Sequence, residues 1–238
     1  MKIAVMADVH ANISALREVL KDIEGQYVDQ IICLGDLVGY ATFPNEVINL
    51  IRENDILTIQ GNYDESVAEG LMACGCNYDD PKKMEQAGKS LFWHQEHVTP
   101  TNKEWLKNLP KEKRLEIEGR DIYLVHGSPR KNNEYLKRDN EAIYEILDEY
   151  DFDILLCGHT HKPYFKAIGD RYVVNAGSAG KPKHGNPRAT YIILDIKAKD
   201  IDFISREVEY NFEETASAIE LEPEMPSAFA DLFRKGNG

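Results

Sequence analysis

Two histidines stand one residue apart in the segment LLCGHTHKP, directly after a run of apolar residues. A single buried histidine is ordinarily a core residue whose hydrogen bonds are satisfied. His159 and His161 instead lie between Gly158 and Pro163, where a strand should end. Imidazole is a common ligand of transition metals, so this spacing indicates a metal site whose other ligands come from elsewhere in the chain.

Polar side chains with similar chemistry follow four other apolar segments. Because the carboxyl ends of parallel strands meet at one edge of an α/β sheet, these groups should converge there. Taken alone, each has a structural alternative, such as a helix cap for Asp8, a turn for Asn62 or a satisfied core histidine for His126. Those alternatives give no reason for the groups to share one edge. The segments ADVH, LGDLVGY, QGNYD and VHGSP supply Asp8, His10, Asp36, Asn62, Asp64 and His126.

The side chains at the strand ends provide a set of ligands for two metal ions. Imidazole and carboxylate suit manganese, iron and zinc. Two divalent ions would leave a net positive charge at the site even with two carboxylates and a hydroxide bound, so an acidic protein would gain a local anion-binding spot. We expect manganese, with iron, zinc, nickel and cobalt as alternatives. Asp8, His10 and His161 would hold the first ion and Asn62, His126 and His159 the second, with Asp36 bridging.

Strands and helices alternate in the first part of the chain. Apolar residues at helical spacing follow the first strand, with Asn12 as the expected N-cap and Gly25 as the expected stop. A second helix opens with Pro44 in its first turn. This β-α-β-α-β order indicates parallel strands covered by helices. The expected strands are 2–7, 29–35 and 56–61, and the expected helices are 12–24 and 44–54.

The middle of the chain breaks this alternation. Residues 64–110 have the pattern of helices with polar interruptions, and we expect them to form a helical cap over the strand ends. We therefore expect one domain over 1–210, with the cap inserted at about 64–110, and a C-terminal helix and polar tail over 211–238. The later elements are strands at 114–127 (with a hairpin-like turn at EGR), 152–158, 164–175, 189–196 and 200–208, and a helix at 140–150.

Composition and charge exclude several kinds of protein. The net charge of −13 argues against an extended nucleic-acid-binding face, which needs clustered positive charge. No apolar stretch approaches the ~20 residues of a membrane span, and the first apolar run meets Asp8 at once. We therefore expect no signal peptide and a cytoplasmic protein.

The four cysteines are too few and too scattered for a disulfide framework. Cys74 and Cys76 are too close together for the usual zinc-finger spacing.

The motifs DVH, GDLVGY, GNYD, VHGSP and GHTH, in this order, resemble those of the calcineurin-like metallophosphoesterase superfamily over residues 1–195. Their spacing and the later segment VNAGSAGKPKHGNPRATYIILD are most similar to its small bacterial and archaeal, YfcE-like phosphodiesterase branch. The resemblance implies an α/β fold, namely a four-layer αββα sandwich of two mixed sheets with a helical cap insertion. It also implies the ligand grouping above and a metal-dependent phosphodiesterase whose bridging hydroxide attacks phosphorus.

One residue departs from the family pattern. Many members carry histidine in the third motif, where it protonates the leaving group, whereas this chain has Tyr63. A phenol with a pKa near ~10 is a poorer proton donor at neutral pH. This favours phosphodiesters and nucleotide anhydrides, whose leaving groups need little protonation. The alternative is that Tyr63 only packs over the site. The expected catalytic residues are Asn62, Tyr63, Asp64 and His126.

Residues of the cap and of a glycine-rich loop are expected to bind substrate. His94 and His97 lie in the cap and are alternative proton donors. Lys181, His184 and Arg188 surround the loop that begins at NAGS, where they could hold a phosphate. The aromatic side chains of the cap could stack on a base. The expected substrate-binding residues are Tyr63, His94, His97, Lys181, His184 and Arg188.

Three functions fit these residues. The leading one is a metal-dependent phosphodiesterase acting on a small phosphoester or a nucleotide. The second is a dinucleoside polyphosphate or other nucleotide hydrolase. The third is a non-catalytic metal-binding scaffold. The presence of all the expected metal ligands argues against this third function. A protein serine/threonine phosphatase is disfavoured because the second motif lacks the aspartate-arginine pair of that branch. The sequence leaves the oligomeric state open, a homo-oligomer included.

Overall fold

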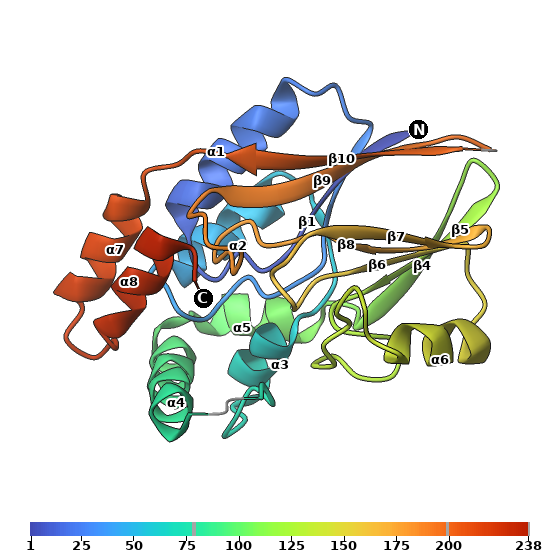
Figure 1. The fold of residues 1–238 in the computed structure, drawn as a ribbon. Helices are drawn as coiled ribbons and strands as arrows, with labels where there is room; N and C mark the ends of the chain where they lie inside the picture. Colours follow the sequence, from blue (N-terminus) through green and yellow to red (C-terminus); the bar gives the residue numbers. More distant parts are fainter. Residues whose placement is uncertain (78–79, 199, 238) are drawn as a thin grey trace.

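Two five-stranded mixed sheets form the centre of the protein in the computed structural model, which describes residues 1–77, 80–198 and 200–237 (Figure 1). The first sheet has the order β10 (Ile201–Val208), β9 (Ala189–Ile196), β1 (Lys2–Met6), β2 (Gln30–Cys33) and β3 (Leu57–Thr58). The second has the order β4 (Glu112–Ile117), β5 (Arg120–Val125), β6 (Ile154–Cys157), β8 (Arg171–Asn175) and β7 (Tyr164–Ile168). β1, β2 and β3 are parallel, as are β5, β6 and β8, and the remaining pairs are antiparallel.

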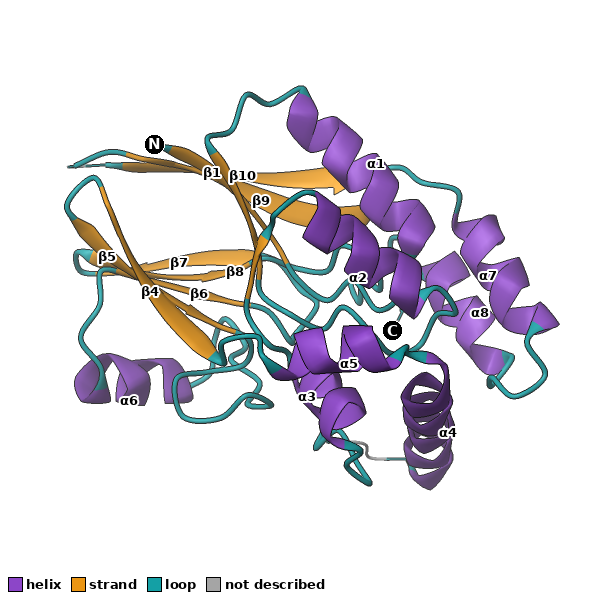
Figure 2. Cartoon of the chain, turned by 180° about the vertical axis from the view of Figure 1, so that it is seen from behind, coloured by secondary structure: helices purple, strands orange, loops and turns teal. Residues whose placement is uncertain are grey.

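Side chains alternate between two cores because successive residues of a strand point to opposite faces. Ile3 and Val5 of β1 lie in the core between the sheets, together with Ile122 and Leu124 of β5. The intervening side chains of β1 pack instead against α1 (Ile13–Glu24) and α2 (Pro44–Glu53). The outer face of the second sheet packs against α6 (Ala142–Glu149). Helices thus cover both outer faces (Figure 2), and the four-layer sandwich expected from the sequence is confirmed.

Local signals explain where several elements begin and turn. The Asn12 side chain accepts a hydrogen bond from the Ala15 amide at 3.1 Å, so the expected N-cap of α1 is present. The turn between β4 and β5 has Glu118 at φ 53° and Gly119 at φ 75°. Two consecutive residues at positive φ suit the twist of a tight hairpin, which accounts for the EGR turn.

Three helices follow β3 at the carboxyl end of the first sheet: α3 (Asn62–Glu69), α4 (Pro81–His97) and α5 (Pro100–Lys107). The sequence pattern predicted helices within residues 64–110, and α3 begins two residues before that range. Its start is set by Asp64, whose carboxylate accepts the Gly61 amide at 3.0 Å in a capping-box arrangement. Within the described part of the chain, no helix has the length and apolarity needed to cross a membrane.

The end of the chain differs from the expected helix and polar tail. α7 (Phe212–Leu221) is followed by a second helix, α8 (Ala228–Lys235), which packs against it. Phe229 and Phe233 are one helical turn apart and both are buried, at 4% and 0% exposure. Phe229 also contacts Tyr40, with ring centroids 5.1 Å apart. Burial of this i, i+4 aromatic pair fixes the segment against the domain.

A half-buried ion pair joins the outer helix layer to the first sheet, and we expect it to stabilise the fold. Asp22 of α1 accepts hydrogen bonds from Arg206 at 2.7 and 3.1 Å and from the Tyr191 hydroxyl at 2.6 Å. Arg206→Met should lower the free energy of unfolding by about 1–2 kcal/mol at pH 7, because hydrogen bonds to a charged partner are lost. Urea unfolding measures this effect, with Arg114→Met, which breaks an exposed pair, as the control.

The pH dependence gives the same prediction a second test. Arg206 holds the pKa of Asp22 below its ordinary value through these hydrogen bonds. The stabilisation should therefore be complete above the ordinary carboxyl pKa of ~4 and disappear as the pH falls through the lowered pKa of the folded protein. A difference between wild type and Arg206→Met that stays constant at all acidic pH values would refute this account.

Candidate metal centre

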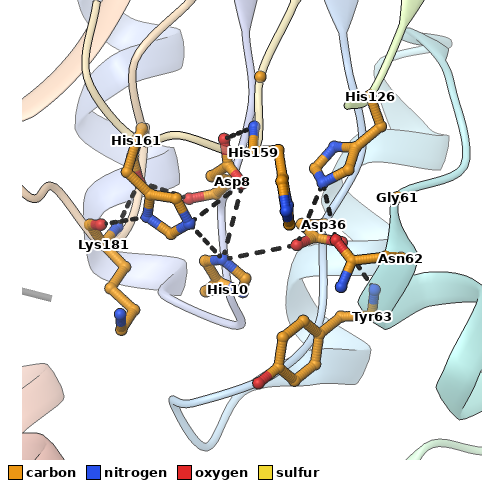
Figure 3. A network of polar contacts seen from close by, with 12 residues as sticks. Asp8, His10, Asp36, Gly61, Asn62, Tyr63, His126, His159, His161 and Lys181 are labelled. Atoms are coloured by element: carbon orange, nitrogen blue, oxygen red, sulfur yellow. Dashed lines mark hydrogen bonds and ion pairs between the residues drawn. The ribbon is translucent and has the colours of Figure 1, made fainter. Parts of the chain in front are cut away.

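The strand-end residues converge at one end of the two sheets (Figure 3). They come from the loops after β1, β2, β5 and β6 and from the first turn of α3. Every one is at most 3% exposed, so their polar atoms depend on protein partners or on a bound ligand. The converging residues are Asp8, His10, Asp36, Asn62, His126, His159 and His161.

One group of potential ligand atoms is formed by Asp8, His10 and His161. The Nε2 atoms of the two imidazoles are 3.3 Å apart. The Asp8 Oδ1 atom lies 3.3 Å from Nε2 of His161 and 3.8 Å from Nε2 of His10. The ligand atoms of the group lie within 4.8 Å of one another, which is compatible with one ion between them.

A second group is formed by Asp36, His126 and His159. The Nε2 atom of His126 lies 3.4 Å from Oδ2 of Asp36 and 3.0 Å from Oδ1 of Asn62. The same Oδ2 atom of Asp36 is 3.7 Å from Nε2 of His10, which belongs to the first group. Asp36 therefore lies between the two groups, and this is the position that a bridging carboxylate requires.

Hydrogen bonds on the far side of three imidazoles orient their ligand atoms. Nδ1 of His10 donates to the Val38 carbonyl at 2.9 Å, Nδ1 of His126 to Leu34 at 2.7 Å, and Nδ1 of His161 to Lys181 at 2.5 Å. A neutral imidazole that donates from Nδ1 keeps a lone pair on Nε2. Backbone carbonyls commonly hold metal-ligating histidines in this way.

The atoms facing the centre are consequently carboxylate and amide oxygens and imidazole Nε2 atoms, each of which can offer a lone pair to a cation. Asp8 Oδ1 and His159 Nε2 are buried and have no hydrogen-bond partner in the described structure. Asn62 donates its amide hydrogens to the Cys74 carbonyl at 2.9 Å, which turns its oxygen toward His126. Buried acceptors that face one another are unfavourable unless a cation lies between them, so the residues fit transition-metal ions.

Burial and charge set the protonation states of these groups. Burial lowers the pKa of His10 and of His159 to about 3 in each case, so both are neutral at pH 7 and available as ligands. Burial also disfavours a charged His126, but the carboxylate of Asp36 raises its pKa to about 9. Burial raises the pKa of Asp8 to about 7. In the absence of metal, a proton on His126 compensates the negative charge of Asp36.

The backbone of the centre is strained. Five of the converging residues have left-handed backbone angles, with φ between 49° and 63°: Asp8, His10, Asp36, His159 and His161. This conformation is unfavourable by about 1–2 kcal/mol for a residue with a side chain. Such strain persists where surrounding contacts impose it, typically at functional sites.

Asp64 imposes part of that geometry. Its Oδ2 atom accepts the amides of Asp36 at 2.8 Å and Gly61 at 3.0 Å, and its Oδ1 atom accepts those of Leu37 at 2.8 Å and Val38 at 3.3 Å. A Cβ atom at Gly61 would lie 2.2 Å from Asp36, so glycine is required at this approach. Both carboxylate oxygens accept backbone amides, so Asp64 ties the loop after β2 to the start of α3.

A cavity of about 410 Å³ adjoins the two ligand groups. Tyr63 and Lys181 line it, as the sequence led us to expect for substrate-binding residues. Five lining residues were not expected from the sequence: Tyr40, Cys76, Tyr135 and the α8 residues Phe229 and Leu232. The helical spacing of Phe229 and Phe233 could have indicated from the sequence that one face of α8 is buried. Tyr135 carries no comparable signal.

The other expected substrate-binding residues are not brought to this cavity. His94 is fully buried and its Nδ1 atom donates to the Ser90 carbonyl at 2.8 Å. His97 is exposed and stacks on Trp93, with centroids 4.0 Å apart. His184 lies beside Glu207 of β10, and Arg188 lies beside Glu209, which follows that strand. Helical periodicity placed the two cap histidines in α4 but could not tell which face meets the cavity.

Comparisons with known proteins agree with this geometry. Residues 1–199 match the calcineurin-like phosphoesterase superfamily domain. An uncharacterized protein of Methanocaldococcus jannaschii, MJ0912, is 29% identical over 235 residues, which cover 91% of each chain. Phosphodiesterase YfcE of Escherichia coli is 26% identical over 207 residues, covering 82% of this chain and 88% of YfcE. The crystal structure of a metallophosphoesterase from Sphaerobacter thermophilus is 27% identical, covers 99% of both chains and has a TM-score of 0.78. The chain therefore belongs to the calcineurin-like phosphoesterase superfamily and is a phosphoric ester hydrolase of the metallophosphoesterase type.

Proposed function

We propose that the protein is a phosphodiesterase that uses two transition-metal ions, with manganese as the first candidate. The observation that supports this most directly is the convergence of lone-pair donors in two groups that share Asp36. Asp8, His10 and His161 would hold one ion, and Asn62, His126 and His159 the other. When bound, the two ions would polarise the phosphoryl group and lower the pKa of water enough to supply a hydroxide near neutral pH.

The chain's own residues would orient these ligands and the substrate. Val38, Leu34 and Lys181 fix three imidazoles through their carbonyls. The Tyr63 amide donates to Oδ1 of Asp36 at 2.8 Å and leaves Oδ2 facing the two ligand groups. Burial of the centre excludes bulk water and strengthens every electrostatic interaction within it.

Tyr63 makes diesters and anhydrides the favoured substrates. Its ring is buried, lines the cavity and lies edge-on to His10, with centroids 5.5 Å apart. A phenol at this position is a poorer proton donor than an imidazole at neutral pH. Leaving groups that depart as stable anions need no such donor. This supports activated diesters and nucleotide anhydrides over alkyl monoesters.

The test is hydrolysis of bis(p-nitrophenyl) phosphate beside p-nitrophenyl phosphate by metal-stripped protein to which manganese is restored. We expect the diester to be hydrolysed faster, no turnover without metal, and a higher monoester rate for Tyr63→His, since an imidazole is the better acid at neutral pH. Tyr63→Phe keeps the ring and removes the hydroxyl, which separates packing from proton donation. Metal-independent turnover would contradict the proposal, and two bound ions without turnover would favour a binding scaffold.

A further inference from the structure

Three lysines from two different segments line the cavity beside the ligand groups. Lys83 comes from the first turn of α4, and Lys181 and Lys183 come from the loop between β8 and β9. The chain as a whole has 41 acidic and 28 basic side chains, so this concentration of positive charge opposes the overall balance. Asp36 and Asp80 are the acidic residues of the cavity wall in the described structure.

Lys181 is buried, at 2% exposure, and among the described residues no carboxylate forms an ion pair with it. Its ammonium lies 4.1 Å from the centre of the Tyr40 ring. A buried ammonium without an anionic partner is unfavourable, and a contact with an aromatic face recovers only part of the lost solvation. An anion in the cavity would supply the missing partner.

The backbone on either side of Lys181 is held firmly against the metal centre. The Lys181 amide donates to Ser178 Oγ at 2.7 Å, and the Lys181 carbonyl accepts from Nδ1 of His161. A Cβ atom at Gly180 would lie 1.8 Å from the Val9 carbonyl oxygen, so the loop is pressed against the segment after β1. Figure 3 shows the Lys181 side chain extending away from His161 and Asp8. The ammonium is thus presented to the cavity at a fixed place beside the ligand groups.

Neither acidic residue of the cavity wall neutralises this charge. Asp80 is the N-cap of α4 and accepts the Lys82 amide at 2.9 Å. Asp36 faces His10 and His126. The cavity therefore offers two adjacent places for negative charge: the two ligand groups with their ions, and the lysines.

We infer, on the basis of the proposed function, that Lys181, with Lys183 and Lys83, binds a second anionic group of the substrate next to the phosphoryl group that reacts. The substrate class is then a phosphoanhydride diester, such as a nucleotide pyrophosphate. The oxygen of water forms the new P–O bond, and the bridging oxygen leaves with the second phosphoryl group. The two protons of the water are shared between the two phosphomonoester products and solvent.

This assignment explains how the centre works with Tyr63 in place of a stronger acid. A phosphomonoester leaves as a stabilised anion and requires no proton in the reacting step. Lysine ammonium groups beside the departing oxygen would stabilise its charge, as electrostatic donors do in other phosphoryl transfers. The apolar wall formed by Phe229 and Leu232 of α8 leaves room for a base or another apolar group attached to the anhydride.

The experiment compares ADP-ribose, which has two anionic phosphoryl groups, with bis(p-nitrophenyl) phosphate, which has one. The protein is the full chain with manganese restored, and the measured quantity is the ratio of kcat/KM for the two substrates. Lys181→Met keeps the length of the side chain and removes its charge. It should lower this ratio about tenfold or more, because charge-assisted hydrogen bonds to one phosphoryl group are lost. The exposed Lys21→Met on α1 is the control.

A ratio within about twofold of wild type would overturn the inference. Lys183→Met, whose side chain is more exposed, replaces Lys181→Met if that variant fails to fold. Failure of the proposed function itself is recognised separately, because wild type would then hydrolyse neither substrate. In that case the affinity for ADP, measured by calorimetry, tests the lysine site. Weaker binding to Lys181→Met than to wild type supports the site, and equal binding refutes it.

Discussion

Asp36→Asn should reduce kcat/KM for bis(p-nitrophenyl) phosphate by on the order of 10³-fold or more, since changes behind a single ligand already cause 10–100-fold losses. Asp36 Oδ2 is the atom that lies within 3.4 Å of His126 and 3.7 Å of His10. Asparagine has the same shape but lacks the negative charge that would bridge the two ions. Both ligand groups are therefore weakened by one substitution.

Elemental analysis makes this prediction specific to the metal centre. We expect the purified Asp36→Asn variant to retain fewer ions than wild type while unfolding with one cooperative transition. Asp202→Asn, on the exposed edge strand β10, removes a carboxylate far from the cavity and provides the matched control. Near-normal turnover by a folded Asp36→Asn protein would exclude the shared-carboxylate arrangement.

The parallel strands with their covering helices and the location of the centre could be predicted because both depend on local patterns, whereas the four-layer sandwich was implied by the family resemblance. Apolar strands such as β1 have side chains that alternate between two cores, and the polar residue that follows each strand marks its end. The rule that parallel strands share one carboxyl edge then brings distant segments together, although Asp8 and His161 are separated by most of the chain. No knowledge of packing was needed for this step.

The cavity wall was harder to predict because it depends on which faces of which helices meet. α8 is a helix of 8 residues near the end of the chain, and its burial follows from contact with Tyr40 and α7. His94 and His97 are close together in α4, yet one is buried beside Ser90 and the other is exposed. Hydrophobic spacing identifies a helix, but tertiary packing decides what each face contacts.

The left-handed backbone angles of the ligand loops could not be predicted from the sequence either. Asp and His can adopt positive φ more readily than branched residues, but nothing in their order indicates that Asp8, His10 and Asp36 all do so. The cause lies in non-local hydrogen bonds. The Asp8 amide donates to Gly35 and the His10 amide to Asp36, both at 2.9 Å. These bonds lock the loops after β1 and β2 together.

The second large effect concerns Asp64, the carboxylate that holds this arrangement. Asp64→Asn should lower the free energy of unfolding by about 3 kcal/mol, because one oxygen acceptor is replaced by an amide group that faces backbone N–H donors. The affected donors are the amides of Asp36 and Gly61 or those of Leu37 and Val38, depending on the orientation of the new side chain. Urea unfolding of the metal-free protein measures this loss, with Glu65→Gln on the same helix as the control.

The same variant separates a positioning role from a catalytic one. If Asp64 acts through the backbone of Asp36, Asp64→Asn should bind manganese more weakly as well as unfold more easily, and added manganese should restore part of the turnover. If Asp64 instead takes part in the chemistry, kcat should fall while stability and metal content stay at wild-type levels. Because each oxygen of Asp64 already accepts two backbone amides, we expect the first result. The second would require one of these amides to be released during turnover.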